Sequence, residues 1–214
     1  MDSKLENVVL FWSKRFIDHL GVISIIISSH QLKKDETIVK VQNMWKIQNK
    51  TKILGKLISK TRQIKLNVQQ NLSQKECWYD LISHMLEELQ EFENYVNNDN
   101  NQHNYYSIQF WTKEHKESSE FLLCQIPVML KSQHPENIKD FIQKTTKLIQ
   151  KWNYVVSKEK FLKYSRIQIH SSKKLLRVII PTLALSDDNK LLLSQLVTHE
   201  IKECIWAHKQ IINS

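Results

Sequence analysis

The chain has 214 residues, of which 41% are hydrophobic and 25% are charged, but it contains only two glycines and three prolines. Sheets need a turn about every eight to twelve residues, commonly built with Gly, Pro, Asn or Asp, whereas long helices need few turns. This composition excludes general disorder and favours an all-α fold over any β architecture. The formal net charge of +9 predicts attraction to acidic or phosphate-rich partners, without specifying one.

Cysteine usage and the N-terminal sequence bear on the compartment. Cys77, Cys124 and Cys204 form no CxxC pair, and an odd number of cysteines is unusual for a secreted disulfide scaffold. The N-terminal segment does not resemble a signal peptide, and no apolar run reaches the roughly 20 residues that a membrane span needs. We therefore expect a cytoplasmic protein without a membrane partner.

Three amphipathic helices are predicted in the first half. Apolar residues at helical spacing predict one helix from Leu5 to about residue 30 and a second, strongly basic helix over residues 35–67. Ser73 and Glu76 have the spacing of a capping box, which predicts a third helix that runs through Tyr95.

The second half repeats this order of elements after an Asn-rich run. A helix is predicted from Tyr105 to about Pro127, and Pro135 opens a long basic helix. Pro181 interrupts the pattern, and Ser186 is the predicted N-cap of a last helix. The Asn-rich run has no apolar anchors and is the predicted linker.

Two sequence echoes suggest an internal duplication. The pair Phe11-Trp12 recurs as Phe110-Trp111, and LISHMLEEL from Leu81 recurs as LVTHEIKEC from Leu196. Chance similarity between amphipathic helices is the alternative explanation. Our hypothesis is a pair of duplicated three-helix units, residues 1–98 and 105–214 with a linker over 99–104, packed as one antiparallel bundle.

Histidines and carboxylates fall on the apolar stripes of these helices. His84 and Glu88 are four residues apart and so share a helix face, as do His199 and Glu203. Burying an ionised carboxylate without a partner costs several kcal/mol, on the order of 3–5, so such residues need a cation or a hydrogen-bond network. The six candidate ligands are His19, His84, Glu88, Glu114, His199 and Glu203.

Imidazole and carboxylate together suit a divalent metal, with iron or manganese favoured and zinc as a further candidate. The alternative is that each His–Glu pair is a local helix contact in a purely structural polar network. The sequence pattern alone leaves both interpretations open.

The segment FWSKRFIDHLGVI resembles the opening helix of ferritin-like, tandemly duplicated bacterial proteins of unknown function. The resemblance implies a metal-binding helical bundle, and a dinuclear iron or manganese centre is one form that its site could take. In the second half, FWTKEHKESSEFL has Ser118 where the in-register histidine would stand, and His115 lies one turn earlier. The ferritin-like order of Glu before His, three apart, is also absent, so a fully symmetric or oxygen-activating centre is not implied.

A binding protein without enzymatic activity is the competing hypothesis. The stretch from Lys40 to Lys65 carries eight basic residues and no acidic one, which could track the phosphates of a nucleic acid or contact an acidic protein partner. The sequence has no phosphate-binding Gly-rich loop and no nucleophile elbow. Whether the protein is an enzyme stays open at this point.

Overall fold

The structure is a computed structural model that describes residues 3–32, 36–46, 53–74, 76–97, 108–130 and 135–213. Within these ranges the chain forms eight α-helices and no β-strand, which confirms the all-α prediction. The chain divides into two compact units, Met1–His103 and Asn104–Ser214, here called the first and second unit. The predicted linker, residues 99–104, lies outside the described residues.

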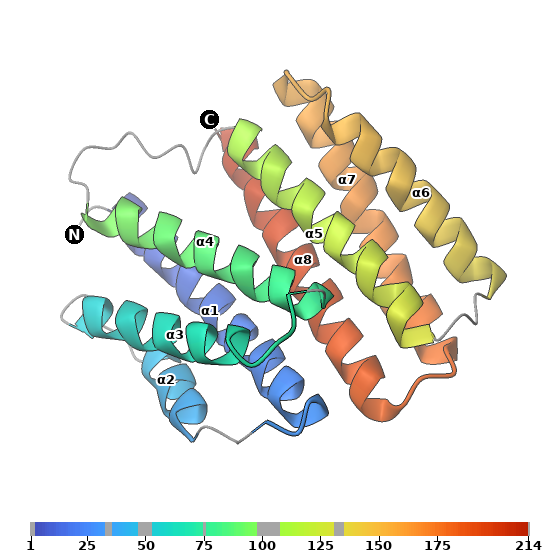
Figure 1. Ribbon diagram of the computed structural model, residues 1–214. Coiled ribbons are helices and arrows are strands. Elements are labelled where there is room, and N and C mark those ends of the chain that lie inside the picture. Colours follow the sequence, from blue (N-terminus) through green and yellow to red (C-terminus); the bar gives the residue numbers. More distant parts are fainter. Residues whose placement is uncertain are drawn as a thin grey trace. The chain divides into compact units, whose positions relative to one another are not determined.

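The described residues of the first unit form four helices (Figure 1). They are α1 (Ser3–Ser29), α2 (Thr37–Lys46), α3 (Leu54–Gln69) and α4 (Cys77–Asn97).

The described residues of the second unit also form four helices. They are α5 (Ile108–Leu130), α6 (Glu136–Trp152), α7 (Lys158–Lys174) and α8 (Asp187–Asn213). A π-helical turn, Leu175–Ile179, and a short 3-10 turn, Ile180–Thr182, extend the end of α7.

The prediction of three helices per unit was wrong, because both long basic helices are helical pairs. The helix expected over residues 35–67 is α2 and α3, and the one expected from Pro135 is α6 and α7. Neither Gly nor Pro marks residues 153–157, where α6 ends, and Ser157 caps α7 by accepting a hydrogen bond from the Lys160 N–H at 3.3 Å. Both helices of a pair bury apolar residues at helical spacing. The periodic pattern in the sequence therefore continues across each break.

Other predicted ends agree with the structure. The helix predicted from Leu5 is α1, and α8 begins directly after Ser186, whose Oγ accepts from the Asn189 N–H at 3.4 Å. The Glu76 carboxylate accepts the Ser73 N–H at 3.2 Å, although α4 begins only at Cys77 because an intervening turn joins them. Local capping chemistry is therefore visible in the sequence.

Aromatic rings from three helices fill the core of the first unit. Trp12 and Phe16 of α1, Trp45 of α2 and Phe92 of α4 are fully buried. The Phe16 ring centroid lies 5.0 Å from that of Trp45 and 5.3 Å from that of Phe92. Such pairs add about 0.5–1.5 kcal/mol each beyond the area they bury, so Phe16 anchors α1 against α2 and α4.

The second unit has a comparable core in which a histidine replaces a phenylalanine. Trp111, His115, Trp152 and Phe161 are buried, and His115 stacks on Phe161 with centroids 5.5 Å apart. His115 also lies 5.4 Å from the Trp152 ring. His115 follows Trp111 by four residues, just as Phe16 follows Trp12 by four residues in the first unit.

None of the helices in the described residues has both the length and the apolar character needed to cross a membrane.

Candidate metal centre

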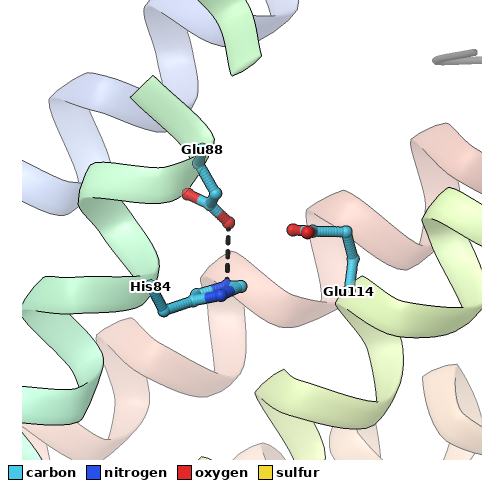
Figure 2. A group of neighbouring side chains, drawn as sticks. All are labelled: His84, Glu88 and Glu114. Atoms are coloured by element: carbon cyan, nitrogen blue, oxygen red, sulfur yellow. Dashed lines mark ion pairs between the residues drawn. The ribbon is translucent and has the colours of Figure 1, made fainter. Parts of the chain in front are cut away.

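Glu88 is the centre of a buried polar cluster in the first unit. Its side chain is only 1% exposed, because α4 places it on the stripe that also buries Met85 and Phe92. His84 lies one turn earlier on the same helix face, and its Nε2 is 2.9 Å from Oε1 of Glu88. Figure 2 shows this pair on successive turns of α4, with the contact dashed.

Helix α1 brings two more groups to this carboxylate. Arg15 and His19 are four residues apart and therefore share one face of α1. Nε2 of His19 lies 3.1 Å from Oε2 of Glu88, and the Arg15 guanidinium forms an ion pair with Oε1. Each carboxylate oxygen thus has an imidazole nitrogen beside it.

The two oxygens of Glu88 differ in their hydrogen bonding. Oε1 accepts from Arg15. Among the residues that the structure describes, no donor makes a hydrogen bond of standard geometry to Oε2, although His19 is at ion-pair distance. A buried carboxylate oxygen in this condition is costly, and a cation shared with the imidazole would relieve that cost.

Lys65 of α3 completes the cluster. Its side chain is 0% exposed, its Nζ lies 3.4 Å from Nδ1 of His19, and it donates to the backbone carbonyl of Met85. Burial lowers the pKa of Lys65 well below its usual value, and the nearby positive charges of Arg15 and Arg62 lower it further. Burial thus shifts Lys65 toward its neutral form.

These residues, Arg15, His19, Lys65, His84 and Glu88, are called the Glu88 cluster. Metal–nitrogen and metal–oxygen bonds of about 2.1 Å at ordinary coordination angles place neighbouring ligand atoms roughly 3 Å apart. The His84–Glu88 and His19–Glu88 separations of 2.9 and 3.1 Å are each compatible with that spacing, and they are also ordinary hydrogen-bond lengths. Two imidazoles and a carboxylate are ligand types that divalent transition metals accept, and Arg15 is a competing cation.

A different cluster occupies the interior of the second unit. Glu200 of α8 is 3% exposed and accepts hydrogen bonds from Gln168 at 2.7 Å, Ser172 at 3.0 Å and Ser119 at 3.4 Å. All three donors are neutral. Gln168 is itself fixed, because its Oε1 accepts the Trp152 indole N–H at 2.9 Å.

Burial raises the pKa of Glu200 to about 7, and the neighbouring charge of Glu203 contributes, while the hydrogen bonds from Gln168, Ser172 and Ser119 oppose the rise. Near neutral pH the protonated and ionised forms of this carboxyl group are therefore close in free energy. The residues Ser119, Gln168, Ser172 and Glu200 are called the Glu200 cluster.

The remaining predicted ligands lie in the second unit. Glu114 of α5 is 2% exposed, and Glu203 of α8 is equally buried. Nε2 of His199 lies 3.9 Å from Oε2 of Glu203, which is a looser contact than that between His84 and Glu88. The structure thus brings together His19, His84 and Glu88 within one unit, and it pairs His199 with Glu203 within the other.

Sequence reasoning missed Arg15, Lys65 and Glu200. Each stands at helical spacing from an apolar residue of its own helix: Arg15 is three residues from Trp12, Lys65 is eight from Leu57, and Glu200 is four from Leu196. A charged residue in such a register was the signal that could have identified them. The basic residues around Lys65 suggested instead a surface that contacts phosphates or an acidic protein partner.

The basic stretch from Lys40 to Lys65 is not one continuous surface. Lys65 is buried, and Arg62 is engaged in an ion pair with Glu93. Lys40 and Lys56 are exposed, while Lys50 and Lys52 lie outside the described residues. The nucleic-acid hypothesis for this stretch therefore loses at least one of its cations.

His30 and Glu76 form a His–Glu contact of the first unit that does not involve Glu88, with Nε2 and Oε2 3.0 Å apart. Their side chains are 28% and 36% exposed, so this pair has the same chemistry as His84–Glu88 without the burial. It is a natural internal control.

Comparison of the chain with protein-family models, with curated proteins and with solved structures found no match.

Proposed function

We propose that this protein binds a divalent transition metal through His19, His84 and Glu88 of the first unit. One observation carries the proposal: a buried carboxylate has an imidazole Nε2 about 3 Å from each of its oxygens. Mixed imidazole and carboxylate ligands suit iron, manganese or zinc, and facing helices are a common source of such sets. Glu114, His199 and Glu203 stay predictions from the sequence as further ligands.

Arg15 is the principal opposing feature. In the metal-free protein its guanidinium neutralises Glu88, which is how a structural ion pair would also behave. A doubly charged ion about 5 Å from Arg15 would be repelled by roughly 7 kcal/mol at an effective dielectric constant near 20. We therefore propose that metal displaces Arg15 from Glu88, and that the neutral form of Lys65 keeps further repulsion small.

The test is metal binding by the full chain without a histidine tag. After chelation and gel filtration, the protein is titrated with Mn²⁺, Zn²⁺ and, under anaerobic conditions, Fe²⁺, and bound metal is measured by elemental mass spectrometry. We expect one ion per chain if Glu88 chelates, or two if it bridges. Glu88→Gln should remove the bound metal, and His19→Asn with His84→Asn should do the same.

His30→Asn is the matched control, because it removes an imidazole from an exposed His–Glu pair and should leave the metal content unchanged. Since Glu88→Gln strands the Arg15 charge, the double variant Arg15→Met/Glu88→Gln, which buries no net charge, is measured beside it. Metal content that is the same in wild type and in both Glu88 variants would contradict the proposal, as would the absence of metal from the wild type.

We also propose that the two units arose by duplication. Two indole hydrogen bonds support this: Trp45 donates to Thr61 at 2.9 Å, and Trp152 donates to Gln168 at 2.9 Å, each across sixteen residues. Four residues beyond those acceptors, Lys65 and Ser172 both hydrogen-bond to equivalent positions of the echoed motif, Met85 and Glu200. The resemblance to ferritin-like proteins stays a prediction.

A further inference from the structure

A hollow of about 540 Å³ opens between α6 and α7 in the second unit. The two helices lie side by side in Figure 1, and the π-helical turn after α7 closes one part of the hollow through Ile179. Its lining is entirely within one compact unit. Its volume falls in the range of roughly 300–1,000 Å³ that is typical of small-molecule sites.

Basic side chains surround this hollow. They recur at intervals of three or four residues on each helix, so each helix directs a row of them to one face. All are exposed to solvent. They are Lys144, Lys147, Lys151, Arg166, His170 and Lys174.

Only one lining residue is acidic. The Asp140 carboxylate lies 2.8 Å from Nζ of Lys144 and 4.0 Å from Nζ of Lys174, so it compensates part of the charge of these two lysines. In the described part of the chain, Lys147, Lys151 and Arg166 have no acidic partner. Like charges at such spacing repel one another, and a bound anion would remove that repulsion.

The floor of the hollow is apolar. Phe141, Leu148 and Ile179 are almost fully buried, and Ile167 is 43% exposed at the opening. A bare inorganic anion would make no use of this floor. A ligand with several phosphate oxygens and an organic ring system would contact both the floor and the cations.

We infer that the hollow between α6 and α7 binds a small molecule of the nucleotide class, with its phosphates on Lys147, Lys151 and Arg166. Arginine suits phosphate oxygens because its planar guanidinium donates two parallel hydrogen bonds. Phe141 is the aromatic residue of the lining and is buried. This favours a single nucleotide over a single strand, whose binding commonly uses a row of exposed aromatic rings. The site is separate from the Glu88 cluster and does not depend on metal binding there.

Isothermal titration calorimetry on the full chain tests this inference, with EDTA in the buffer so that metal binding does not contribute. ATP is the probe, with tripolyphosphate and adenosine as its charged and apolar parts. We expect ATP to bind more tightly than tripolyphosphate, adenosine to bind more weakly than both, and the affinity for ATP to fall as salt is raised.

Two double variants with the same change in net charge separate the hollow from general attraction. Lys147→Glu/Arg166→Glu should weaken ATP binding at least about tenfold. Lys160→Glu/Lys163→Glu, on exposed positions of α7 that do not line the hollow, should retain the wild-type affinity within about twofold. Both are checked for native helical content by circular dichroism.

An equal loss in the two double variants would overturn the inference, because only the overall charge would then matter. An absence of ATP binding would also overturn it. If a single-stranded oligonucleotide binds and ATP does not compete with it, the surface serves nucleic acid instead, and the nucleotide assignment is wrong.

Discussion

Nζ of Lys65 lies 3.4 Å from Nδ1 of His19, and both side chains are buried in the first unit. An amine that donates to Nδ1 leaves the proton of a neutral imidazole on Nε2, the nitrogen that faces Glu88. The direction of the hydrogen bond between Lys65 and Nδ1 therefore goes with the tautomer of His19 that meets the carboxylate. A metal ion at Nε2 would have to replace that proton.

Lys65→Met should raise the free energy of unfolding. Methionine fills a similar volume and removes an amine whose burial is costly, on the order of 1–3 kcal/mol for a buried polar group. Urea unfolding at fixed pH measures the change. Lys56→Met, at an exposed position of the same helix, is the control and should shift stability by no more than about 0.5 kcal/mol. A strongly destabilised Lys65→Met protein would show that the amine is required.

Arg15→Met should lower the free energy of unfolding of the metal-free protein and raise its affinity for metal. Removing the guanidinium leaves Glu88 buried and uncompensated, which costs about 3–5 kcal/mol. Mn²⁺ should restore the thermal midpoint of this variant, since a ligand bound only by the folded state stabilises it. The measurement is thermal unfolding with and without Mn²⁺.

Arg62→Met is the control for that experiment, because Arg62 pairs with Glu93 outside the Glu88 cluster. It should respond to Mn²⁺ as the wild type does. If Mn²⁺ stabilises Arg15→Met no more than Arg62→Met, Arg15 does not compete with a metal ion.

Thr61→Val should cost about 1–3 kcal/mol, because it leaves the buried indole N–H of Trp45 without its acceptor. Thr146→Val is closely matched: both hydroxyls also donate to the carbonyl four residues earlier, but Thr146 is exposed and accepts no indole hydrogen bond. Denaturant unfolding of both variants isolates the indole contact. Equal losses would mean that this hydrogen bond contributes nothing measurable.

The raised pKa of Glu200 predicts that the free energy of unfolding falls as pH rises. Its pKa is about 7 when folded and about 4.5 when exposed, so between these values the folded state binds more protons than the unfolded state. Its contribution to stability is thus fully present below about pH 4.5 and is lost as pH rises toward 7. The loss is on the order of 3 kcal/mol.

Glu200→Gln should flatten this part of the stability profile, because the amide resembles the protonated carboxyl. It can accept from Gln168 and donate to Ser172. Denaturant unfolding at pH 5 and pH 8 measures the difference, and Glu120→Gln, at an exposed position of the same unit, should keep the wild-type profile. A Glu200→Gln profile as steep as that of the wild type would place the pH dependence elsewhere.

The sequence by itself determined the helical class, most helix ends and the local pairs. Scarce Gly and Pro exclude sheets, Ser186 marks the start of α8, and a spacing of four places His84 beside Glu88. The helix ends and the local pairs depend on residues within about one helical turn of each other, where the backbone fixes the geometry. Local spacing also explains why one helix was predicted over residues 35–67. Two consecutive helices that both bury apolar residues at helical spacing give the same pattern as one long helix.

Only the tertiary structure decided which groups meet Glu88. Arg15 is 73 residues away in sequence, and Lys65 and His19 are 46 residues apart, so no spacing rule connects them. Tertiary packing also decided that Lys65 is buried while the basic residues of α6 and α7 surround an exposed hollow. The local sequence does not tell whether a lysine is exposed to solvent or buried, because its burial depends on which helices pack against it.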